Sequence, residues 1–323
     1  KFPRLVRSID KVGGLTCEAA EACGLLPGTP VFGGCGDMQS AAIGSGAIGE
    51  GDGHIYLGTS GWVGVTTSKA PTGSHGVVTL QSGDPNMNLL LGEMETAGAC
   101  LEWVKNEFYK HEQNDPNILN IYALMDDEIR SVSPGADYLI CTPWLYGERC
   151  PVTDPIVRST FFNLSASHRR EHMLRAVYEG VAYNLRWIVE ILEHKFAFNI
   201  PVLRVIGGGS KSVEWMQMIA DITNRQVETL LQPQMAGTVG AALIATVGLG
   251  IYPDFTCANQ LVTVDRIFHP QPQNIQVYNE LYNTYKSLYY TLRKVYQNIN
   301  CTRVQKLQHR STDSKDKKST MPL

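Results

Sequence analysis

The stretch GGCGDMQSAAIGSGAIGEGDGHIYLGTSG, residues 33–61, contains two glycine turns separated by a segment of small residues. The first turn ends in Asp37, directly before a predicted short helix over residues 38–43. Glycine lets a backbone approach a ligand closely, and the dipole of a helix N-terminus favours an ionised carboxylate. Asp37 therefore fits a general base for a hydroxyl group, which must be a charged carboxylate within hydrogen-bond reach. It equally fits a plain helix cap.

The second turn, Gly58-Thr59-Ser60-Gly61, joins two predicted strands, residues 54–57 and 62–67. Consecutive backbone N–H groups and two hydroxyls at such a turn form an anion-binding nest. An ordinary β-turn uses the same residue types, and taken in isolation the sequence of this turn favours the ordinary β-turn.

A third glycine turn, Gly207-Gly208-Gly209-Ser210, connects a predicted strand over 202–206 to a predicted helix over 213–223. The helix N-terminus would point at a nucleotide that lies across the glycines. A tight loop between strand and helix is the alternative, but three glycines cost conformational entropy that such a loop does not require. The pattern favours a ligand site.

Two further patterns resemble known site motifs but stand in the wrong context. Residues 44–49 fit G-x-G-x-x-G, yet they follow a predicted helix, whereas a dinucleotide fingerprint follows a strand. A nicotinamide-dependent dehydrogenase is disfavoured accordingly. His168 and His172 fit H-x-x-E-H, but they lie in the polar first turn of a predicted helix without an evident third ligand. We expect a solvated helix start there, capped by Ser167, and no zinc.

The composition of the chain is that of an ordinary globular protein of 323 residues with a net charge of −3. This charge gives no reason to expect nucleic acid or an anionic membrane surface as partner, and no apolar run approaches the length of a membrane span. Eight cysteines without a C-x-x-C pair favour reduced thiols and a cytoplasmic location. The sequence leaves a homodimer open.

The order of the predicted elements indicates a layered α/β fold. Short β-runs come first, and a long helix over 169–196 then precedes an alternation of strand, helix, strand and helix from 202 to 247. We expect no strand before residue 31, a last amphipathic helix over 273–300, and a polar, disordered tail from Thr302. The other expected elements are helices over 16–26, 97–108 and 118–130, and strands over 77–80, 88–91 and 138–141.

Taken in order, these motifs resemble the FGGY family of carbohydrate kinases, and its xylulose kinase branch most closely. Besides the three turns, the resemblance rests on four segments of the chain. They are AGACLEW at 97–103, PWLYGERCP at 143–151, LRAVYEGVAYN at 174–184 and AGTVGAA at 236–242.

The resemblance implies an actin-like, ribonuclease-H-like ATPase fold that binds ATP and Mg²⁺ and phosphorylates a small-molecule sugar. Residues 1–49 would end the family's N-terminal domain, residues 50–301 would form its C-terminal nucleotide-binding domain, and 302–323 would be the tail. It assigns no protein ligand to a metal. The implied site residues are Asp37 as catalytic base, Gly58, Thr59 and Ser60 at the phosphates, Gly98 near the phosphates or ribose, and Gly208, Gly209 and Ser210 at the adenine pocket.

One family element has no counterpart in this chain, the Asp-x-Gly-Thr phosphate loop of the first domain. We therefore expect the chain to be the C-terminal part of a longer protein. Most sugar contacts would lie in the other part, so xylulose, gluconate, ribulose and fuculose all stay open as substrates. A nucleotide-binding fragment without turnover is the alternative to an active kinase.

Overall fold

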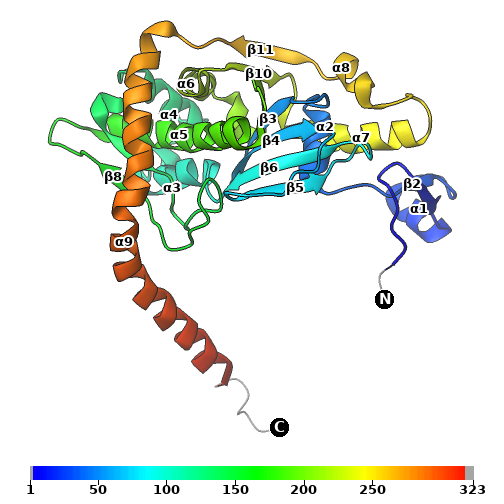
Figure 1. Cartoon of the computed structure of the whole chain (residues 1–323), viewed down its shortest axis with the longest axis horizontal. Helices are drawn as coiled ribbons and strands as arrows, with labels where there is room; N and C mark the ends of the chain where they lie inside the picture. Colours follow the sequence, from blue (N-terminus) through cyan, green and yellow to red (C-terminus); the bar gives the residue numbers. More distant parts are fainter. Residues whose placement is uncertain (1–2, 317–323) are drawn as a thin grey trace.

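The computed structural model describes residues 3–316 and is built around one seven-stranded sheet (Figure 1). The neighbouring strands β10, β9 and β3 run parallel, and the other pairings in this sheet are antiparallel. Ligand sites in such sheets lie beyond the carboxyl ends of the parallel strands. The order is β11 (Val264–Phe268), β10 (Gln226–Leu230), β9 (Val202–Ile206), β3 (Gly53–Leu57), β4 (Gly61–Thr67), β6 (Asn88–Met94) and β5 (Val77–Gln81).

The two faces of the sheet bury different residues, because side chains alternate along a strand. Ile55 and Leu57 of β3 belong to the large apolar core, whereas Tyr56 packs against a second apolar cluster on the other face. There the ring of Tyr56 stacks on that of Trp62 with 4.0 Å between their centroids. The β3–β4 hairpin is thus held from both sides, and this fixes the turn at its tip.

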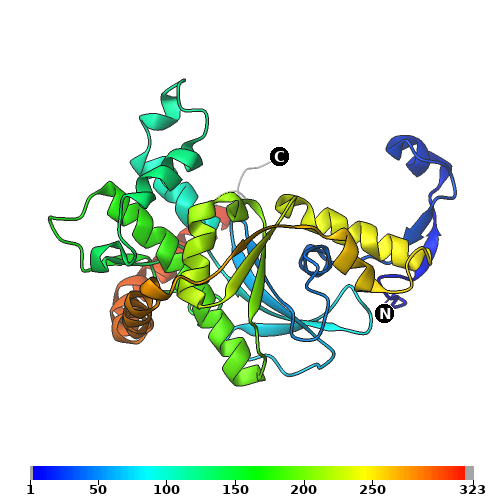
Figure 2. The ribbon, with the colours of Figure 1, turned by 90° about the horizontal axis from the view of Figure 1, so that it is seen from above.

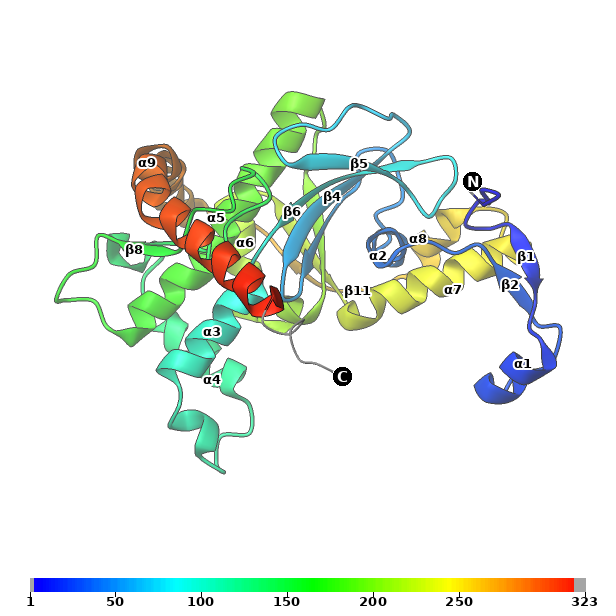
Figure 3. The same ribbon diagram turned by 90° about the horizontal axis from the view of Figure 1, so that it is seen from below.

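Helices cover both faces. Figures 2 and 3 show α2 and α7 on one side of the strands and the group from α3 to α6 on the other. The large core joins the sheet to α3 (Gly98–Phe108), α4 (Ile121–Arg130), α5 (Arg170–Phe196), α6 (Val213–Thr223) and α9 (Pro272–Asp316). The second face is covered by α2 (Asp37–Gly44) and α7 (Ala236–Gly248), and the smaller helices are α1 (Cys17–Cys23) and α8 (Ala258–Leu261).

The helices α2 and α7 cross with their backbones in contact. A Cβ atom added to Gly44 would lie 1.8 Å from the carbonyl oxygen of Ala236, and one added to Gly240 would lie 1.8 Å from that of Ser40. Only glycine fits at both positions, and this pair of small residues sets the distance between the two helices.

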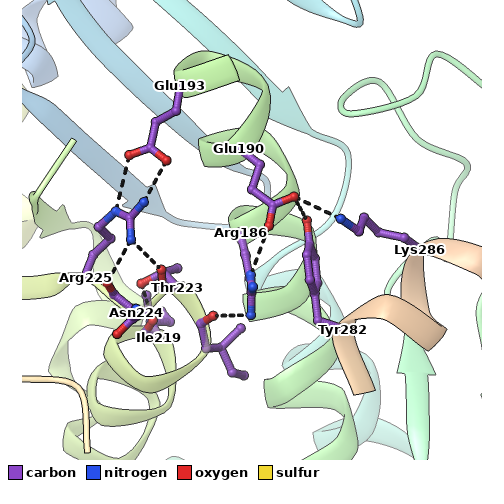
Figure 4. Close-up of polar contacts among 10 residues, drawn as sticks. Arg186, Glu190, Glu193, Ile219, Thr223, Asn224, Arg225, Tyr282 and Lys286 are labelled. Atoms are coloured by element: carbon purple, nitrogen blue, oxygen red, sulfur yellow. Dashed lines mark hydrogen bonds and ion pairs between the residues drawn. The ribbon is translucent and has the colours of Figure 1, made fainter. Parts of the chain in front are cut away.

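Helix α9 is fastened to α5 by a polar cluster (Figure 4). The ring of Tyr282 lies between two cations, with the Arg186 guanidinium 4.1 Å and the Lys286 ammonium 4.2 Å from its centroid. The Tyr282 hydroxyl donates to Glu190 Oε2 at 2.7 Å, and Lys286 Nζ lies 3.0 Å from the same oxygen. Burial raises the pKa of Glu190, but these partners outweigh it and hold the pKa below its usual value.

A second ion pair in the same view connects α5 to the end of α6. Arg225 Nη2 lies 2.7 Å from Glu193 Oε2, while Nη1 of the same guanidinium donates to the carbonyl of Asn224 at 2.9 Å (Figure 4). Arg186 Nη1 adds a 3.0 Å hydrogen bond to the carbonyl of Ile222. Polar contacts therefore link α5 both to the end of α6 and to α9.

Most predicted elements are present within a few residues, and helix 213–223 has the predicted bounds. Thr16 caps α1, and Gly24 ends it with a backbone in the left-handed region. The G-x-G-x-x-G stretch begins at the last residue of α2 and leads through a loop towards β3, which is the predicted context. None of the helices within residues 3–316 combines the length and the apolar content needed to cross a bilayer.

Several expectations were wrong. Three strands were not predicted: β1 (Lys11–Gly14), which pairs with β2 (Pro30–Phe32), β8 (Thr160–Phe162), which pairs with β7 (Ile140–Thr142), and β11. These strands are short and paired only at one side, so their patterns are weak. Arg169, not Ser167, is the N-cap of α5. Helix α9 continues to Asp316, so the tail expected from Thr302 is helical up to that residue. Residues 317–323 lie outside the described range.

Candidate nucleotide-binding site

A pocket of about 850 Å³ opens at the carboxyl ends of β3 and β9, a size that suits a small-molecule ligand. Leu57, Gly58 and Thr59 line it from the β3–β4 hairpin, and Gly208 and Gly209 line it from the turn after β9. Gly98 and other residues of α3, part of α4 and the start of α6 also line it, and the remaining lining residues include Tyr146, Tyr178 and Gln234. Residues from three distant segments of the sequence thus meet around one cavity.

The Gly58–Ser60 turn offers hydrogen-bond donors to this cavity. Gly58 N donates to Ser60 O at 3.0 Å and closes the turn. Within the described part of the chain, the backbone N–H groups of Thr59 and Ser60 and both side-chain hydroxyls have no partner. Thr59 is exposed and lines the pocket, whereas Ser60 is half-buried and does not. The turn therefore has the donors of an anion nest, with Thr59 as its part that faces the cavity.

Gly98 fixes that turn. Its N–H donates to Gly58 O at 2.8 Å, while Ala97 N and Ala99 N both donate to Thr59 O at 3.0 Å. A Cβ atom on residue 98 would lie 2.5 Å from Gly58 O. Gly98 lines the pocket, but its N–H is engaged with the hairpin, so the absence of a side chain at this position lets α3 approach the turn closely.

The four residues of the Gly207–Ser210 turn have different roles: two line the pocket and two make contacts within the protein. Gly207, with φ of 91°, would bring a Cβ atom within 2.5 Å of Leu57 O, so it joins the turn to β3. Gly208 and Gly209 line the pocket. Ser210 is buried and its Oγ donates to Gly207 O at 2.7 Å, which closes the turn. Ser210, expected at the adenine pocket, does not line the cavity.

Asp37 is the first residue of α2, on the other face of the sheet from the large core. Its carboxylate is exposed, and Oδ1 accepts from Met38 N at 2.9 Å. Met38 packs against the same apolar cluster as Tyr56 and Trp62, the residues that flank the Gly58–Ser60 hairpin. Asp37 is not among the residues that line the pocket.

The sequence interpretation missed a polar group in the pocket wall. Asp126 of α4 accepts through Oδ1 from Ser212 Oγ at 2.8 Å and from the Tyr178 hydroxyl at 3.0 Å. Burial raises the pKa of Asp126, and these two hydrogen bonds oppose the shift. Ser212 caps α6 by accepting from Trp215 N at 3.1 Å. Asp126 has no glycine turn or motif around it, so no pattern pointed to it.

Glu148, in the PWLYGERCP segment, is buried and hydrogen-bonded to protein groups. Its Oε1 accepts from Glu95 N at 2.7 Å and its Oε2 from Asn184 Nδ2 at 3.0 Å. Burial raises the pKa of Glu148 to about 8, and backbone donors, including Glu95 N and Arg149 N, oppose the shift. Arg149 itself is exposed and lies 2.8 Å from Glu93. Of this segment, Tyr146 lines the pocket.

The two histidines of the H-x-x-E-H pattern are bound to protein groups. His172 Nε2 lies 3.2 Å from Asp137 Oδ2, and His168 Nε2 lies 3.1 Å from Asp137 O. Among the described residues, no group of three or more His, Cys, Asp or Glu side chains is arranged to hold a metal ion.

Residues 53–249 match the FGGY family of carbohydrate kinases, C-terminal domain. The chain belongs to this family. It is 32% identical over 290 residues to xylulose kinase of Staphylococcus epidermidis, and the alignment covers 89% of this chain and 56% of that relative. It is 29% identical over 284 residues to gluconokinase of Bacillus licheniformis, and this alignment covers 87% of the chain and 55% of that relative. It therefore spans about half the length of the curated relatives it matches.

The fold of this FGGY chain matches solved structures. The crystal structure of xylulose kinase from Rhodospirillum rubrum superposes with a TM-score of 0.79 at 30% identity, over 91% of this chain and 58% of that one. The predicted actin-like ATPase fold, with its mixed α/β arrangement around a central sheet, is thus confirmed.

Proposed function

We propose that this chain is the nucleotide-binding portion of a carbohydrate kinase that transfers phosphate from ATP to a sugar hydroxyl. One observation carries the proposal: Gly58, Thr59, Gly98, Gly208 and Gly209 come from three separate segments and line a single pocket. The match of residues 53–249 to the C-terminal domain of the family agrees with it. The cavity of about 850 Å³ is large enough for a nucleotide.

In this proposal the protein contributes mainly alignment and charge, since phosphoryl transfer needs little covalent help. The N–H groups and hydroxyls of the Thr59 turn would bind the phosphates of ATP. Asp37 would accept the proton of the attacking sugar hydroxyl, for which an exposed carboxylate at the start of α2 is suited. The shared packing of Met38, Tyr56 and Trp62 supports this role, because it links the start of α2 to the hairpin that carries Thr59.

Mg²⁺ belongs to the proposal as a partner of the triphosphate. This ion keeps several waters and is usually bound by one or two carboxylates together with substrate phosphates. The absence of a three-residue ligand group among the described residues is compatible with that mode. The exposed Thr59 hydroxyl and Asp37 carboxylate are two oxygen donors that this chain could offer. When bound, the ion would neutralise charge on the phosphates.

The acceptor we propose is a xylulose-type sugar, because relatives that are 32% identical to this chain are named xylulose kinase. Relatives named gluconokinase match almost as long a stretch, so gluconate is the first competitor, and ribulose and fuculose follow. A cytoplasmic location and a homodimer are also proposals, the former supported by eight cysteines without a C-x-x-C pair.

A second candidate is a nucleotide-binding part that does not turn over by itself. The observation in its favour is that the pocket lining includes the proposed nucleotide turns but not Asp37. Measuring ATP binding and sugar-dependent ADP release on this chain separates the two candidates. Binding without release favours the second one.

The test of the first candidate is Asp37→Asn in the full-length protein, assayed for sugar phosphorylation and, by calorimetry, for ATP binding. We expect turnover to fall by about 10²–10⁴-fold, the usual contribution of a general base, with ATP affinity nearly unchanged. Asp254→Asn is the matched control, because Asp254 is also an exposed aspartate at a helix start, where asparagine caps equally well. Near-normal turnover in Asp37→Asn would refute its role.

A further inference from the structure

Asp126 differs from the other carboxylates of the pocket wall. Glu102 is paired with Lys105 at 2.7 Å and accepts from the Tyr122 hydroxyl at 2.9 Å. Glu107 is paired with Lys110 at 2.7 Å. Asp126 has no cation partner among the side chains of residues 3–300, and its Oδ2 takes part in no hydrogen bond there. One acceptor oxygen in the wall of the cavity is therefore free for a ligand.

The orientation of Asp126 is fixed by its surroundings. Its Oδ1 accepts from both Ser212 and Tyr178, and an oxygen of a carboxylate offers about two acceptor positions. Tyr178 is 1% exposed, and Ser212 Oγ also accepts from Trp215 N. The carboxylate is thus held by a buried donor and a helix cap, with one oxygen filled and the other one available.

We propose that Asp126 accepts a hydrogen bond from the exocyclic amino group of adenine, and thereby makes the pocket prefer adenine over 6-oxopurine nucleotides. This inference rests on the proposed nucleotide site. Adenine carries an N–H donor at position 6, where hypoxanthine and guanine carry a carbonyl oxygen. A carbonyl there would face the carboxylate oxygen, and both acceptors would lose their partners, which sites of this kind reject strongly.

The base fits this wall better than the ribose does. Asp126 has one carboxylate oxygen left, which suits a single N–H donor such as the adenine amino group. The same pocket is lined by Leu101, Ala123 and Trp215, apolar groups that suit the face of a purine. The anion-binding turn at Thr59 lies on a different element of the lining, as a nucleotide with separate base and phosphate contacts requires.

The experiment measures the dissociation constants of ATP, inosine triphosphate and 2′-deoxy-ATP for the unsubstituted chain, Asp126→Asn and Asp126→Ala. We expect the unsubstituted chain to bind ATP at least about ten-fold more tightly than inosine triphosphate, in keeping with a charge-assisted hydrogen bond. Asp126→Asn can donate to the 6-carbonyl, so this ratio should fall about ten-fold or more, and Asp126→Ala should bind both nucleotides similarly. Thr59→Ala is the control, since it should weaken both nucleotides equally and keep the ratio.

The outcomes separate this inference from the function on which it rests. If the unsubstituted chain binds neither triphosphate, the proposed function fails and the inference fails with it. If it binds ATP and inosine triphosphate equally, or if both Asp126 variants keep the original ratio with an unchanged melting temperature, only the inference is overturned. Loss of discrimination between ATP and 2′-deoxy-ATP in these variants, with the ATP-to-inosine ratio intact, would assign Asp126 to the ribose and overturn it too.

Discussion

The crossing of α2 and α7 provides a sharp test of the fold. Gly240→Ala adds one methyl group at a point where the helices touch through their backbones. The new Cβ would lie 1.8 Å from Ser40 O, 2.7 Å from Ser40 C and 3.0 Å from Gly44 N. These are backbone atoms, so no side-chain rotation can relieve the clash, and α2 must move away from α7.

The size of the effect follows from two opposing terms. Alanine in a helix interior is favoured over glycine by about 1 kcal/mol. Overpacking of a tight core usually costs about 1–3 kcal/mol and sometimes more. A clash of the new Cβ with the backbone of α2 should cost at least the upper value of this range, because no side chain can move away. We therefore expect Gly240→Ala to lower the free energy of unfolding by about 2–4 kcal/mol.

The assay is equilibrium unfolding in urea, followed by circular dichroism, with Gly237→Ala as the matched control. Gly237 lies in the same helix, and a Cβ atom there would meet nothing within 4 Å. The control should be neutral or stabilising by up to about 1 kcal/mol. If Gly240→Ala and Gly237→Ala shift the midpoint alike, α2 and α7 do not cross as described.

Three further predictions concern other parts of the chain. His54 is buried with its pKa lowered to about 4, so the unfolded chain binds the extra proton between about pH 6.5 and 4, and stability is lost as the pH falls through that window. Urea unfolding should show a loss of about 2 kcal/mol from pH 7 to 5 that His54→Asn largely removes; an equal loss in the variant contradicts this. Tyr282→Phe removes the hydroxyl that bonds Glu190 and should cost about 1 kcal/mol in the same assay, whereas Tyr290→Phe, at an exposed ring, should cost nothing measurable. Gly98→Ala should displace the Gly58 carbonyl and weaken ATP binding about ten-fold by calorimetry, or the turn does not bind phosphate.

Much of the architecture is predictable from local patterns. The α6 helix begins after its N-cap Ser212 and ends before Asn224, whose backbone is left-handed. The apolar residues between these two caps recur at helical spacing, so the sequence predicts both ends of the helix. The β3–β4 hairpin is equally clear, because a Gly-Thr-Ser-Gly turn separates two β-runs. Sequence patterns do not predict an edge strand such as β11. Its apolar and polar residues alternate weakly, its side chains are mostly exposed, and its position at the sheet edge depends on pairing with β10.

The pocket is only partly predictable for a related reason. The glycine turns are visible in the sequence as unusual local composition, and Gly58, Thr59, Gly208 and Gly209 from two of them line the cavity. Asp126 lies in an ordinary amphipathic helix, and its importance comes from Ser212 and Tyr178, which are distant in the sequence. A residue whose environment is made by tertiary contacts leaves no periodic or compositional trace.

The glycines themselves require two separate explanations that the sequence does not distinguish. Gly98 and Gly207 would each place a Cβ atom 2.5 Å from a backbone carbonyl oxygen, so they serve contacts within the protein. At Gly208 the nearest atom is the side-chain amide nitrogen of Gln234 at 3.4 Å, and the rest of its surroundings is open pocket. Glycine at 208 is thus not required by packing, which agrees with the proposed close approach of a nucleotide at this position. The substitution of Gly208 should accordingly affect nucleotide binding far more than folding, whereas substitution of Gly207 should affect both.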